Sequence, residues 1–389
     1  MSKIEQQTNI SAHLKAELLS YGIVPAQSFL DMYGPPFLEK RRAYGNPDDA
    51  SFHVHTLPQE LYILPERLVC AVNIRSGSPW CLDWTKKNGY SVYNRERPGQ
   101  RTEVSFPLRP RFYDQTLPGG EPVQNFVTLY GGGSLGVFVN GCCSLNDMGQ
   151  ACGFCSLAPN RSRQTEFPVV LKAHQVRKAL QSALRDNETP ITQVMINGGN
   201  FPDTDRGFLY YVNIVQEARR AIDSIGRDVD LHLIVGPPHD LELIHRLKDL
   251  NVSVAINLEV HDPDMFNRYC PGKHKVFGRD HVERALMACV EHLGPGQVYS
   301  IFVGGLEPVD SLATGILHVA ESGIIPIVNV FHPDPETPLA NFPSPSPADI
   351  VQMGRSLQSV FAKHSFAKPF YLDCGRNSID TEAYRGLFI

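Results

Sequence analysis

Four cysteines lie close together in one loop of the sequence and could bind a metal. Cys142, Cys143, Cys152 and Cys155 fall within 14 residues. Cys152 and Cys155 form a C-x-x-C pair whose thiolates can reach one metal site, and either Cys142 or Cys143 would supply a third. Three thiolates with no histidine nearby suit an iron–sulfur cluster that keeps one iron open. We expect Cys143, which lies nearer to the loop, to be the first ligand, with Cys142 as the alternative.

The cysteine loop is also compatible with three roles besides an iron–sulfur cluster. A structural zinc ion normally has four ligands, and the sequence does not place the nearest spare cysteines, Cys81 and Cys270, beside the loop. A thioredoxin-like redox pair normally opens a helix in a small fold of its own. The third role is that of buried cysteines without chemistry. Nine cysteines is nevertheless a high count for a protein whose thiols stay reduced.

The overall composition narrows the class of protein. Lysine and arginine number 36 against 41 aspartates and glutamates, so the net charge of the 389-residue chain is −5. An acidic balance argues against affinity that comes mainly from nucleic-acid phosphates. No apolar run approaches the roughly 20 residues of a membrane span, and the first residues lack the apolar core of a secretory signal. We therefore expect a cytoplasmic protein with neither nucleic acid nor a membrane as its partner.

The elements that must position the cysteine loop alternate regularly from about residue 126. Short apolar runs predict strands buried on both faces, as in a parallel sheet, and the segments between them have helical periodicity. Six strand–helix units are too few for an eight-fold barrel, so we predict an α/β fold with a partial (β/α)6 TIM-like barrel. In such barrels the chemistry lies at the carboxyl ends of the strands. The six runs are 127–141, 191–198, 230–236, 253–259, 298–305 and 324–332.

The rest of the chain is assigned around this barrel. Residues 1–125 are predicted to form an N-terminal α+β extension, which is helical over 1–33 and otherwise has no assigned fold. Residues 126–345 form the barrel, and residues 346–389 form a C-terminal helix and tail. One of the barrel helices is predicted over residues 239–250.

The cysteine loop resembles the cluster loop of the radical SAM superfamily. In that superfamily the loop follows the first barrel strand, and the residue before the last cysteine is usually aromatic, as Phe154 is here. The usual spacing is C-x3-C-x2-C, and an insertion enlarges the first interval in this chain. The resemblance implies a [4Fe–4S] cluster and S-adenosylmethionine (SAM) as cofactors.

The strand ends add to this resemblance in the expected order. Gly198, Gly199 and Asn200 stand where the superfamily has a Gly-Gly-Glu motif that faces the SAM ammonium, and an amide oxygen can also accept that hydrogen bond. The ends of the fourth, fifth and sixth strands are similar to the biotin synthase and lipoyl synthase branch. The residues that the resemblance assigns to SAM binding are Phe154, Gly198, Gly199, Asn200, Asn257, Glu259, Gly304, Glu307 and Val330.

The resemblance also implies a reaction. In the superfamily one electron cleaves SAM, and the resulting 5′-deoxyadenosyl radical takes a hydrogen atom from the substrate. We expect such an enzyme here, acting on a small molecule in cofactor or natural-product biosynthesis and reduced by a partner such as flavodoxin or ferredoxin. In the loop after the fourth strand, Arg268 could hold a carboxylate, and Tyr269 and Cys270 could donate a hydrogen atom. These three are the candidate catalytic residues.

Three competing functions predict different behaviour. A zinc-stabilised barrel with hydrolytic or lyase chemistry predicts a colourless protein that does not bind SAM. An iron–sulfur sensor without enzymatic activity predicts a cluster whose absorbance does not respond to SAM. An unusual cluster loop could also cleave another sulfonium bond of SAM, which would give a 3-amino-3-carboxypropyl radical and methylthioadenosine.

Overall fold

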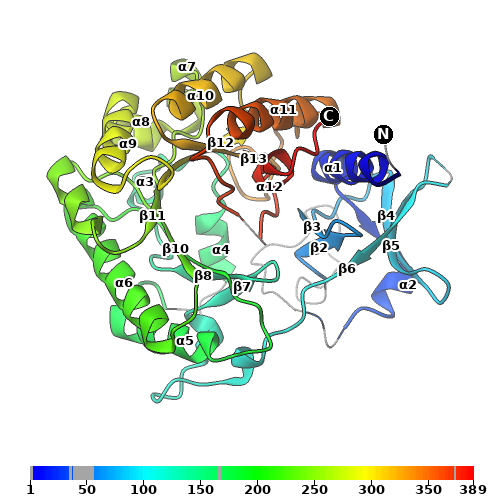
Figure 1. Ribbon diagram of the computed structural model, residues 1–389, viewed down its shortest axis with the longest axis horizontal. Coiled ribbons are helices and arrows are strands. Elements are labelled where there is room, and N and C mark those ends of the chain that lie inside the picture. Colours follow the sequence, from blue (N-terminus) through cyan, green and yellow to red (C-terminus); the bar gives the residue numbers. More distant parts are fainter. Residues whose placement is uncertain (1–2, 35–36, 38–56, 98, 164–167, 372–373) are drawn as a thin grey trace.

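A computed structural model of the chain describes residues 3–34, 37, 57–97, 99–163, 168–371 and 374–389. Two sheets make up its strand content, one of seven strands and one of six. The seven-stranded sheet forms an open arc with helices along its outer side (Figure 1). The prediction of an α/β half-barrel is confirmed by this arrangement.

The seven-stranded sheet follows the order of the sequence, from β13 to β7. Its strands are β7 (Thr128–Tyr130), β8 (Ser134–Phe138), β9 (Gln193–Asn197), β10 (Asp230–Ile234), β11 (Ser253–Ala255), β12 (Val298–Gly304) and β13 (Ile325–Val330). Strands β8 to β13 pair in parallel, whereas β7 pairs antiparallel with β8. Every residue of β12 is buried, as a strand covered on both faces requires.

Helices on the outer side of the arc bury one apolar face each. They are α5 (Ala173–Leu184), α6 (Thr204–Ile225), α9 (Arg279–Leu293), α10 (Val309–Glu321) and α11 (Pro347–Lys363). The buried side chains of α6 recur at helical spacing. Fully burying one such Leu, Ile or Phe side chain contributes about 1.5–3 kcal/mol.

One predicted helix is shorter and tighter than expected. The segment predicted as a helix over residues 239–250 forms only a 3-10 helix, Leu241–Leu247. Asp240 caps its start by accepting from the backbone N–H of Glu242, and the helix ends where Lys248 takes an extended ψ of 143°. The connection from β10 to β11 therefore contains only this short 3-10 helix.

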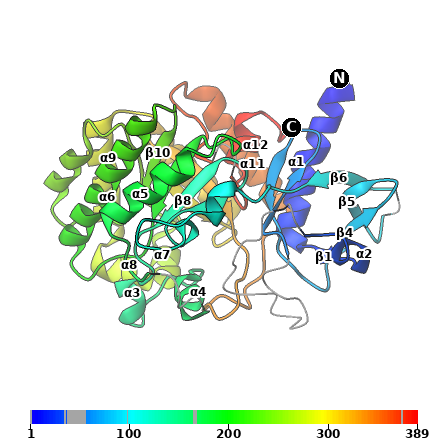
Figure 2. The same ribbon diagram turned by 90° about the horizontal axis from the view of Figure 1, so that it is seen from below.

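Short helices gather at the carboxyl ends of the strands. They are α3 (Ser144–Asp147), α4 (Leu157–Arg163), α7 (Pro263–Tyr269) and α8 (Pro271–Val276). Figure 2 shows them on one side of the half-barrel, the lower side in that view. The cysteine loop runs through α3 to the start of α4, so it lies on this side as well.

Residues within the predicted N-terminal α+β extension form the second sheet, whose strand order the sequence did not predict. Its order is β1-β4-β5-β6-β2-β3. The strands are β1 (Val24–Pro25), β2 (Glu60–Ile63), β3 (Leu68–Ala71), β4 (Trp80–Thr85), β5 (Gly89–Asn94) and β6 (Arg101–Ser105), with α1 (Lys3–Tyr21) and α2 (Gln27–Leu30) beside them. Single 3-10 turns at Arg111–Asp114 and Val123–Asn125 lead into the half-barrel.

A buried lysine joins this region to the C-terminal tail, which carries the short helix α12 (Asp380–Tyr384). Lys15 in α1 is 1% exposed. Its Nζ donates to Glu382 Oε1 at 2.8 Å and to the carbonyls of Gly375 and Ser378 at 2.9 and 2.7 Å. All three ammonium donors are therefore satisfied. The tail also pairs with the edge of the half-barrel, because Val330 N–H donates to the carbonyl of Asn377.

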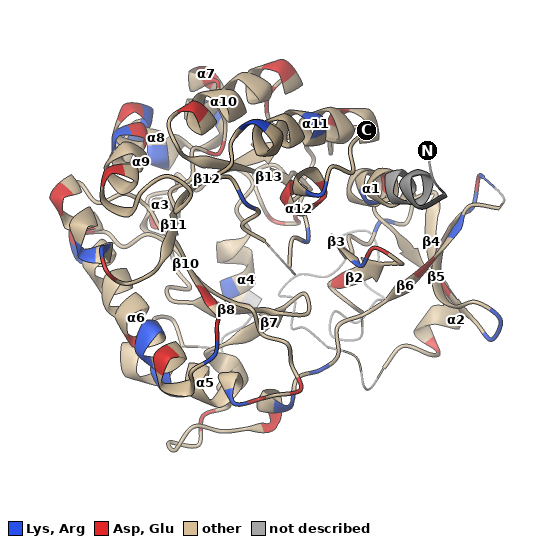
Figure 3. Cartoon of the chain, viewed as in Figure 1, with Lys and Arg blue, Asp and Glu red and all other residues tan. Residues whose placement is uncertain are grey.

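The described surface mixes both signs of charge. Lysine and arginine lie among aspartate and glutamate along the outer helices (Figure 3). Among the described residues, no helix has both the length and the apolar character needed to cross a membrane.

Candidate active site

A cavity of about 570 Å³ lies at the carboxyl ends of the half-barrel strands. This is the face on which barrel enzymes carry their chemistry. Its volume is within the range of small-molecule sites, about 300–1,000 Å³. Each strand from β8 to β13 contributes a lining residue. Five of these residues lie at or near the carboxyl end of their strand, and Ile301 lies in the middle of β12: Phe138, Asn197, Ile234, Asn257, Ile301 and Asn329.

All four cysteines of the predicted cluster loop line this cavity. Burial, followed by the charge of Cys152, raises the pKa of Cys155 to about 12. A hydrogen bond from Cys270 lowers the pKa of Cys152, which is buried beside it. Within the described ranges, no three His, Cys, Asp or Glu side chains are grouped closely enough to hold a metal ion. The thiols of Cys142, Cys143, Cys152 and Cys155 therefore surround a shared space without meeting at one point.

Two neighbouring loops hold the cysteine loop in place. Gly153 N–H donates to the carbonyl of Tyr269 at 2.8 Å, and Leu339 N–H donates to the carbonyl of Gly153 at 3.0 Å. On the other side of Cys152, Gly272 N–H donates to the carbonyl of Gln150 at 3.1 Å. The loop that bears the thiols is thus bound by backbone hydrogen bonds from the α7–α8 segment and from the segment after β13.

The glycines after β9 let the cysteine backbone approach closely. A Cβ on Gly199 would lie 1.9 Å from the carbonyl oxygen of Cys142, so only glycine fits there. Asn200 follows, with its carbonyl accepting from Ser144 N–H at 2.9 Å and its side-chain Nδ2 3.9 Å from Cys143 Sγ. Gly198, Gly199 and Asn200 all line the cavity, as the sequence predicts.

Two buried amide oxygens face the same cavity without a protein partner. The Oδ1 atoms of Asn197 and Asn257 are buried, and neither has a hydrogen-bond partner among the residues that the structure describes. Both residues line the cavity. A buried acceptor without a hydrogen bond costs about 1–3 kcal/mol of stability. Such atoms therefore indicate a ligand that brings hydrogen-bond donors.

A buried ion pair lies beside these amides. Glu259 is 6% exposed and adopts a left-handed φ of 66°. Its Oε1 accepts from Lys273 Nζ at 2.5 Å, and the same Nζ lies 3.4 Å from the carbonyl oxygen of Asn257. Burial lowers the pKa of Lys273, but the charges of Glu259 and Cys152 outweigh burial and raise it above its ordinary value. Lys273 therefore keeps its charge within the cavity wall.

These residues fit an iron–sulfur cluster and SAM. Thiolate sulfur is the donor that iron–sulfur clusters use, and four thiols face one cavity. The unpartnered oxygens of Asn197 and Asn257 match the ammonium and hydroxyl donors of SAM. The wall also includes the predicted Phe154 and Glu259.

Three of the residues predicted to bind SAM lie away from the cavity. Glu307 accepts from the backbone N–H groups of His261 and Asp262 at 2.6 and 3.0 Å, so its carboxylate caps the loop before α7. Gly304 packs against α11, where a Cβ would lie 2.6 Å from Met353 Sδ. Val330 is buried, and its N–H is occupied by the tail.

The three candidate catalytic residues also lie outside the cavity wall. Arg268 is exposed, and its guanidinium lies 5.5 Å from the centre of the Tyr269 ring. Tyr269 is buried with its ring against Phe342. Cys270 is fully buried behind Cys152.

Lys273, Asn329 and Tyr371 also line the cavity, and the predictions gave them no role. Lys273 follows Cys270 in the predicted loop, and its charge was the available signal. Asn329 lies in β13, where its alternation with buried neighbours marks it as inward-facing. Tyr371 comes from the tail and hydrogen-bonds Asn329, and burial raises the pKa of its phenol. No local pattern could have placed Tyr371, because its position depends on a long-range contact.

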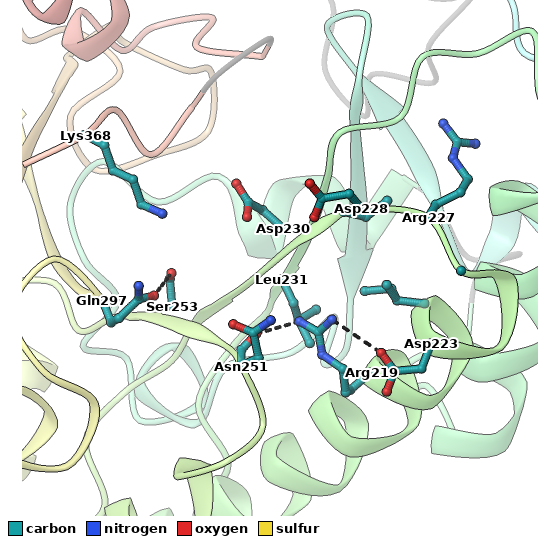
Figure 4. A pocket seen from close by; sticks show the side chains of 13 residues that line it. Arg219, Asp223, Arg227, Asp228, Asp230, Leu231, Asn251, Ser253, Gln297 and Lys368 are labelled. Carbon is teal, nitrogen blue, oxygen red and sulfur yellow. Dashed lines mark hydrogen bonds and ion pairs between the residues drawn. The ribbon is translucent and has the colours of Figure 1, made fainter.

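A second, polar depression of about 360 Å³ lies at the opposite, amino ends of the strands (Figure 4). The arginines that line it donate hydrogen bonds to backbone carbonyls. Arg219 donates to the carbonyls of Leu250 and Asn251, and Arg227 donates to those of Leu184, Asp186 and Ile191. These hydrogen bonds stabilise the loops at the amino ends of the strands. The candidate active site is the cavity at the carboxyl ends.

A half-barrel with four thiols and unpartnered polar groups at its carboxyl ends is the arrangement expected of radical SAM enzymes. No family model matches the chain. A curated relative is bacteriochlorophyllide c C-7(1)-hydroxylase of Chlorobaculum limnaeum, which is 24% identical over 266 residues. The match covers 64% of this chain and 64% of the relative, so the chain spans less than two thirds of that protein's length.

Two solved structures align with part of this chain. HydG, a maturase of the [FeFe]-hydrogenase, is 13% identical with a TM-score of 0.43, and the match covers 58% of this chain and 49% of HydG. A radical SAM methyltransferase from Sphaerobacter thermophilus is 16% identical with a TM-score of 0.41, and the match covers 70% of both chains. The finer likeness to the biotin synthase and lipoyl synthase branch stays a prediction.

Proposed function

We propose that the chain is a radical SAM enzyme whose [4Fe–4S] cluster and SAM bind in the cavity at the carboxyl ends of the half-barrel. The observation that carries this proposal is that one cavity is lined by four cysteines and by two asparagines with unpartnered buried amide oxygens. When bound, the cluster and SAM would supply a 5′-deoxyadenosyl radical that takes a hydrogen atom from the substrate.

The cysteine loop would hold the cluster. Cys152 and Cys155 are the proposed ligands from the C-x-x-C pair, and Cys143 is the proposed third. The contact between Asn200 Nδ2 and Cys143 Sγ favours Cys143 over Cys142, because it ties that thiol to the strand-end motif. The backbone hydrogen bonds at Gly153 fix the loop against its neighbours, which limits the movement of the ligands.

The strand ends would hold SAM. Asn197 and Asn257 offer amide oxygens to its donors, and Gly199 permits close approach of the backbone. Glu259 is held by Lys273 in a fixed orientation toward the cavity, where a carboxylate suits the two ribose hydroxyls. Gly304, Glu307 and Val330, also predicted to bind SAM, support the cavity from outside its wall.

The substrate we propose is a small molecule with an apolar part. Beyond the polar residues, the wall is made of Phe138, Leu157, Ile234, Val235 and Ile301. Phe138 is 42% exposed at the end of β8, so an apolar surface is available to an entering substrate. Because the curated relative is named as acting on bacteriochlorophyllide c, pigments of that kind are the first substrates to test. A cytoplasmic reductant such as flavodoxin or ferredoxin would supply the electron.

The experiment is a SAM cleavage assay without oxygen. The protein is reconstituted with iron and sulfide, mixed with SAM and dithionite, and assayed for 5′-deoxyadenosine and methylthioadenosine by mass detection. We expect 5′-deoxyadenosine, no product from the Cys152→Ala, Cys155→Ala double variant, and unchanged product from Cys289→Ala, whose thiol is buried in α9. Methylthioadenosine in its place would identify the other sulfonium cleavage. A colourless protein with stoichiometric zinc, or a full cluster that yields neither product, would refute the proposal.

A further inference from the structure

The segment from Tyr269 to Lys273 is docked on the cysteine loop around Cys152. Two backbone hydrogen bonds bracket the contact, from Gly153 N–H to the carbonyl of Tyr269 and from Gly272 N–H to the carbonyl of Gln150. A Cβ on Gly272 would lie 2.4 Å from the carbonyl oxygen of Gln150. This close fit brings the side chain of Cys270 against that of Cys152.

The two thiols meet in a dry environment. Cys270 is 0% exposed and Cys152 is 9% exposed. They share a small cluster of buried apolar side chains that includes Val260, Phe266 and Phe331. Cys270 does not line the cavity, so it lies behind Cys152 as seen from the ligand side. Water is thus absent from the contact as a competing hydrogen-bond donor.

The two thiols are hydrogen-bonded to each other. A thiolate bound to iron has no proton to donate, so with Cys152 as a ligand the S–H of Cys270 is the donor. Cys152 is one of the proposed cluster ligands, so the donor acts on a sulfur that would be bonded to iron. Hydrogen bonds to ligating sulfur withdraw negative charge from the metal site and raise its reduction potential.

We propose that Cys270 is a positioning residue for the cluster, whose S–H donates to Cys152 Sγ and raises the potential at which the cluster accepts its electron. The inference rests on the proposed function, since it requires the cluster. It gives Cys270 a place behind a ligand, in contrast to the hydrogen-atom donor predicted from the sequence, which would have to face the substrate.

The test is the midpoint potential of the reconstituted cluster in variants of Cys270. Cys270→Ala and Cys270→Val remove the donor, with valine filling the apolar site, and Cys270→Ser keeps a donor. Cys289→Ala is the matched control, because Cys289 is equally buried but belongs to the core of α9. Iron and sulfide contents are measured on the same samples, and each potential is read by a redox titration followed by electron paramagnetic resonance.

We expect all variants to retain the wild-type iron content. The alanine and valine variants should lower the equilibrium constant for one-electron reduction on the order of tenfold, which corresponds to about 59 mV. The serine variant should recover most of this change, and Cys289→Ala should not alter the potential.

Each contrary result has a separate meaning. If the Cys270→Ala and Cys270→Val variants have the same midpoint potential as the wild type, the inference is refuted and the proposed function stands. Loss of iron from both of these variants, with Cys289→Ala unaffected, would make Cys270 a ligand and also overturn the positioning role. A wild-type protein that takes up no iron refutes the proposed function itself, and the role of Cys270 is refuted with it.

Discussion

Replacing Gly199 by alanine should displace the cysteine loop. The added Cβ would lie 1.9 Å from the carbonyl oxygen of Cys142, 2.7 Å from its carbonyl carbon and 2.9 Å from Cys143 Cα. All three are backbone atoms, which no side-chain rotation can remove. The loop would have to move by at least 1.1 Å, the difference between 1.9 Å and the 3.0 Å that side-chain carbons keep from other atoms.

Two magnitudes follow from this displacement. Overpacking of a close contact costs about 1–3 kcal/mol of unfolding free energy. A misplacement of about 1 Å at a reacting site costs about 100-fold in activity, so SAM cleavage should fall by about that factor. The assays are urea unfolding of the metal-free protein and 5′-deoxyadenosine formation by the reconstituted protein.

Gly77→Ala is the matched control for Gly199→Ala. A Cβ on Gly77 would meet no atom within 4 Å, so its unfolding free energy should change by less than about 0.5 kcal/mol. If Gly199→Ala unfolded at the same urea concentration as Gly77→Ala and cleaved SAM at the wild-type rate, the close approach of the β9 end to the cysteine backbone would be refuted.

Three further perturbations test the interior. Lys15→Met would leave Glu382 buried without its charge partner and should cost about 3–5 kcal/mol in urea unfolding; a loss below about 1 kcal/mol, as at an exposed pair, would contradict the buried junction. Lys273→Met should weaken SAM binding measured by calorimetry about 10- to 100-fold, because Glu259 loses a charged hydrogen bond, and Lys273→Arg should lose less; equal binding by all three proteins would refute this role. Burial raises the pKa of Cys289 from 9.0 to about 12, so its stabilising contribution is complete below pH 9.0 and is lost as the pH rises toward 12. Between pH 8 and pH 10 the metal-free wild type should therefore lose on the order of 1 kcal/mol more than Cys289→Ala, and parallel losses would contradict the shift.

The part of the site that follows from local spacing was predictable. The C-x-x-C pair and the glycines after β9 are short patterns, and each lines the cavity. Strand-end position also placed Asn257 and Glu259 beside this cavity, because parallel strands present their carboxyl ends on one face.

Residues whose role depends on a distant partner were not predictable. The pattern around Glu307 is the same whether the carboxylate faces a ligand or caps a loop, and the structure shows the cap at His261 and Asp262. Tyr371 reaches the cavity only because the tail folds back, with its backbone N–H donating to Asp380 Oδ2. The strand order of the N-terminal sheet was not predictable, because strands far apart in the sequence are neighbours in it, as where β2 pairs with β6.

The central claim is that SAM binds in the cavity between the cysteine loop and the strand ends, beside the open iron of the cluster. The most direct measurement is electron nuclear double resonance of the reduced cluster with SAM labelled with 15N at its amino group. We expect a 15N coupling in the wild-type protein and its absence from Cys152→Ala, Cys155→Ala, which should hold no cluster. A fully loaded wild-type cluster that shows no 15N coupling at saturating SAM would contradict this claim.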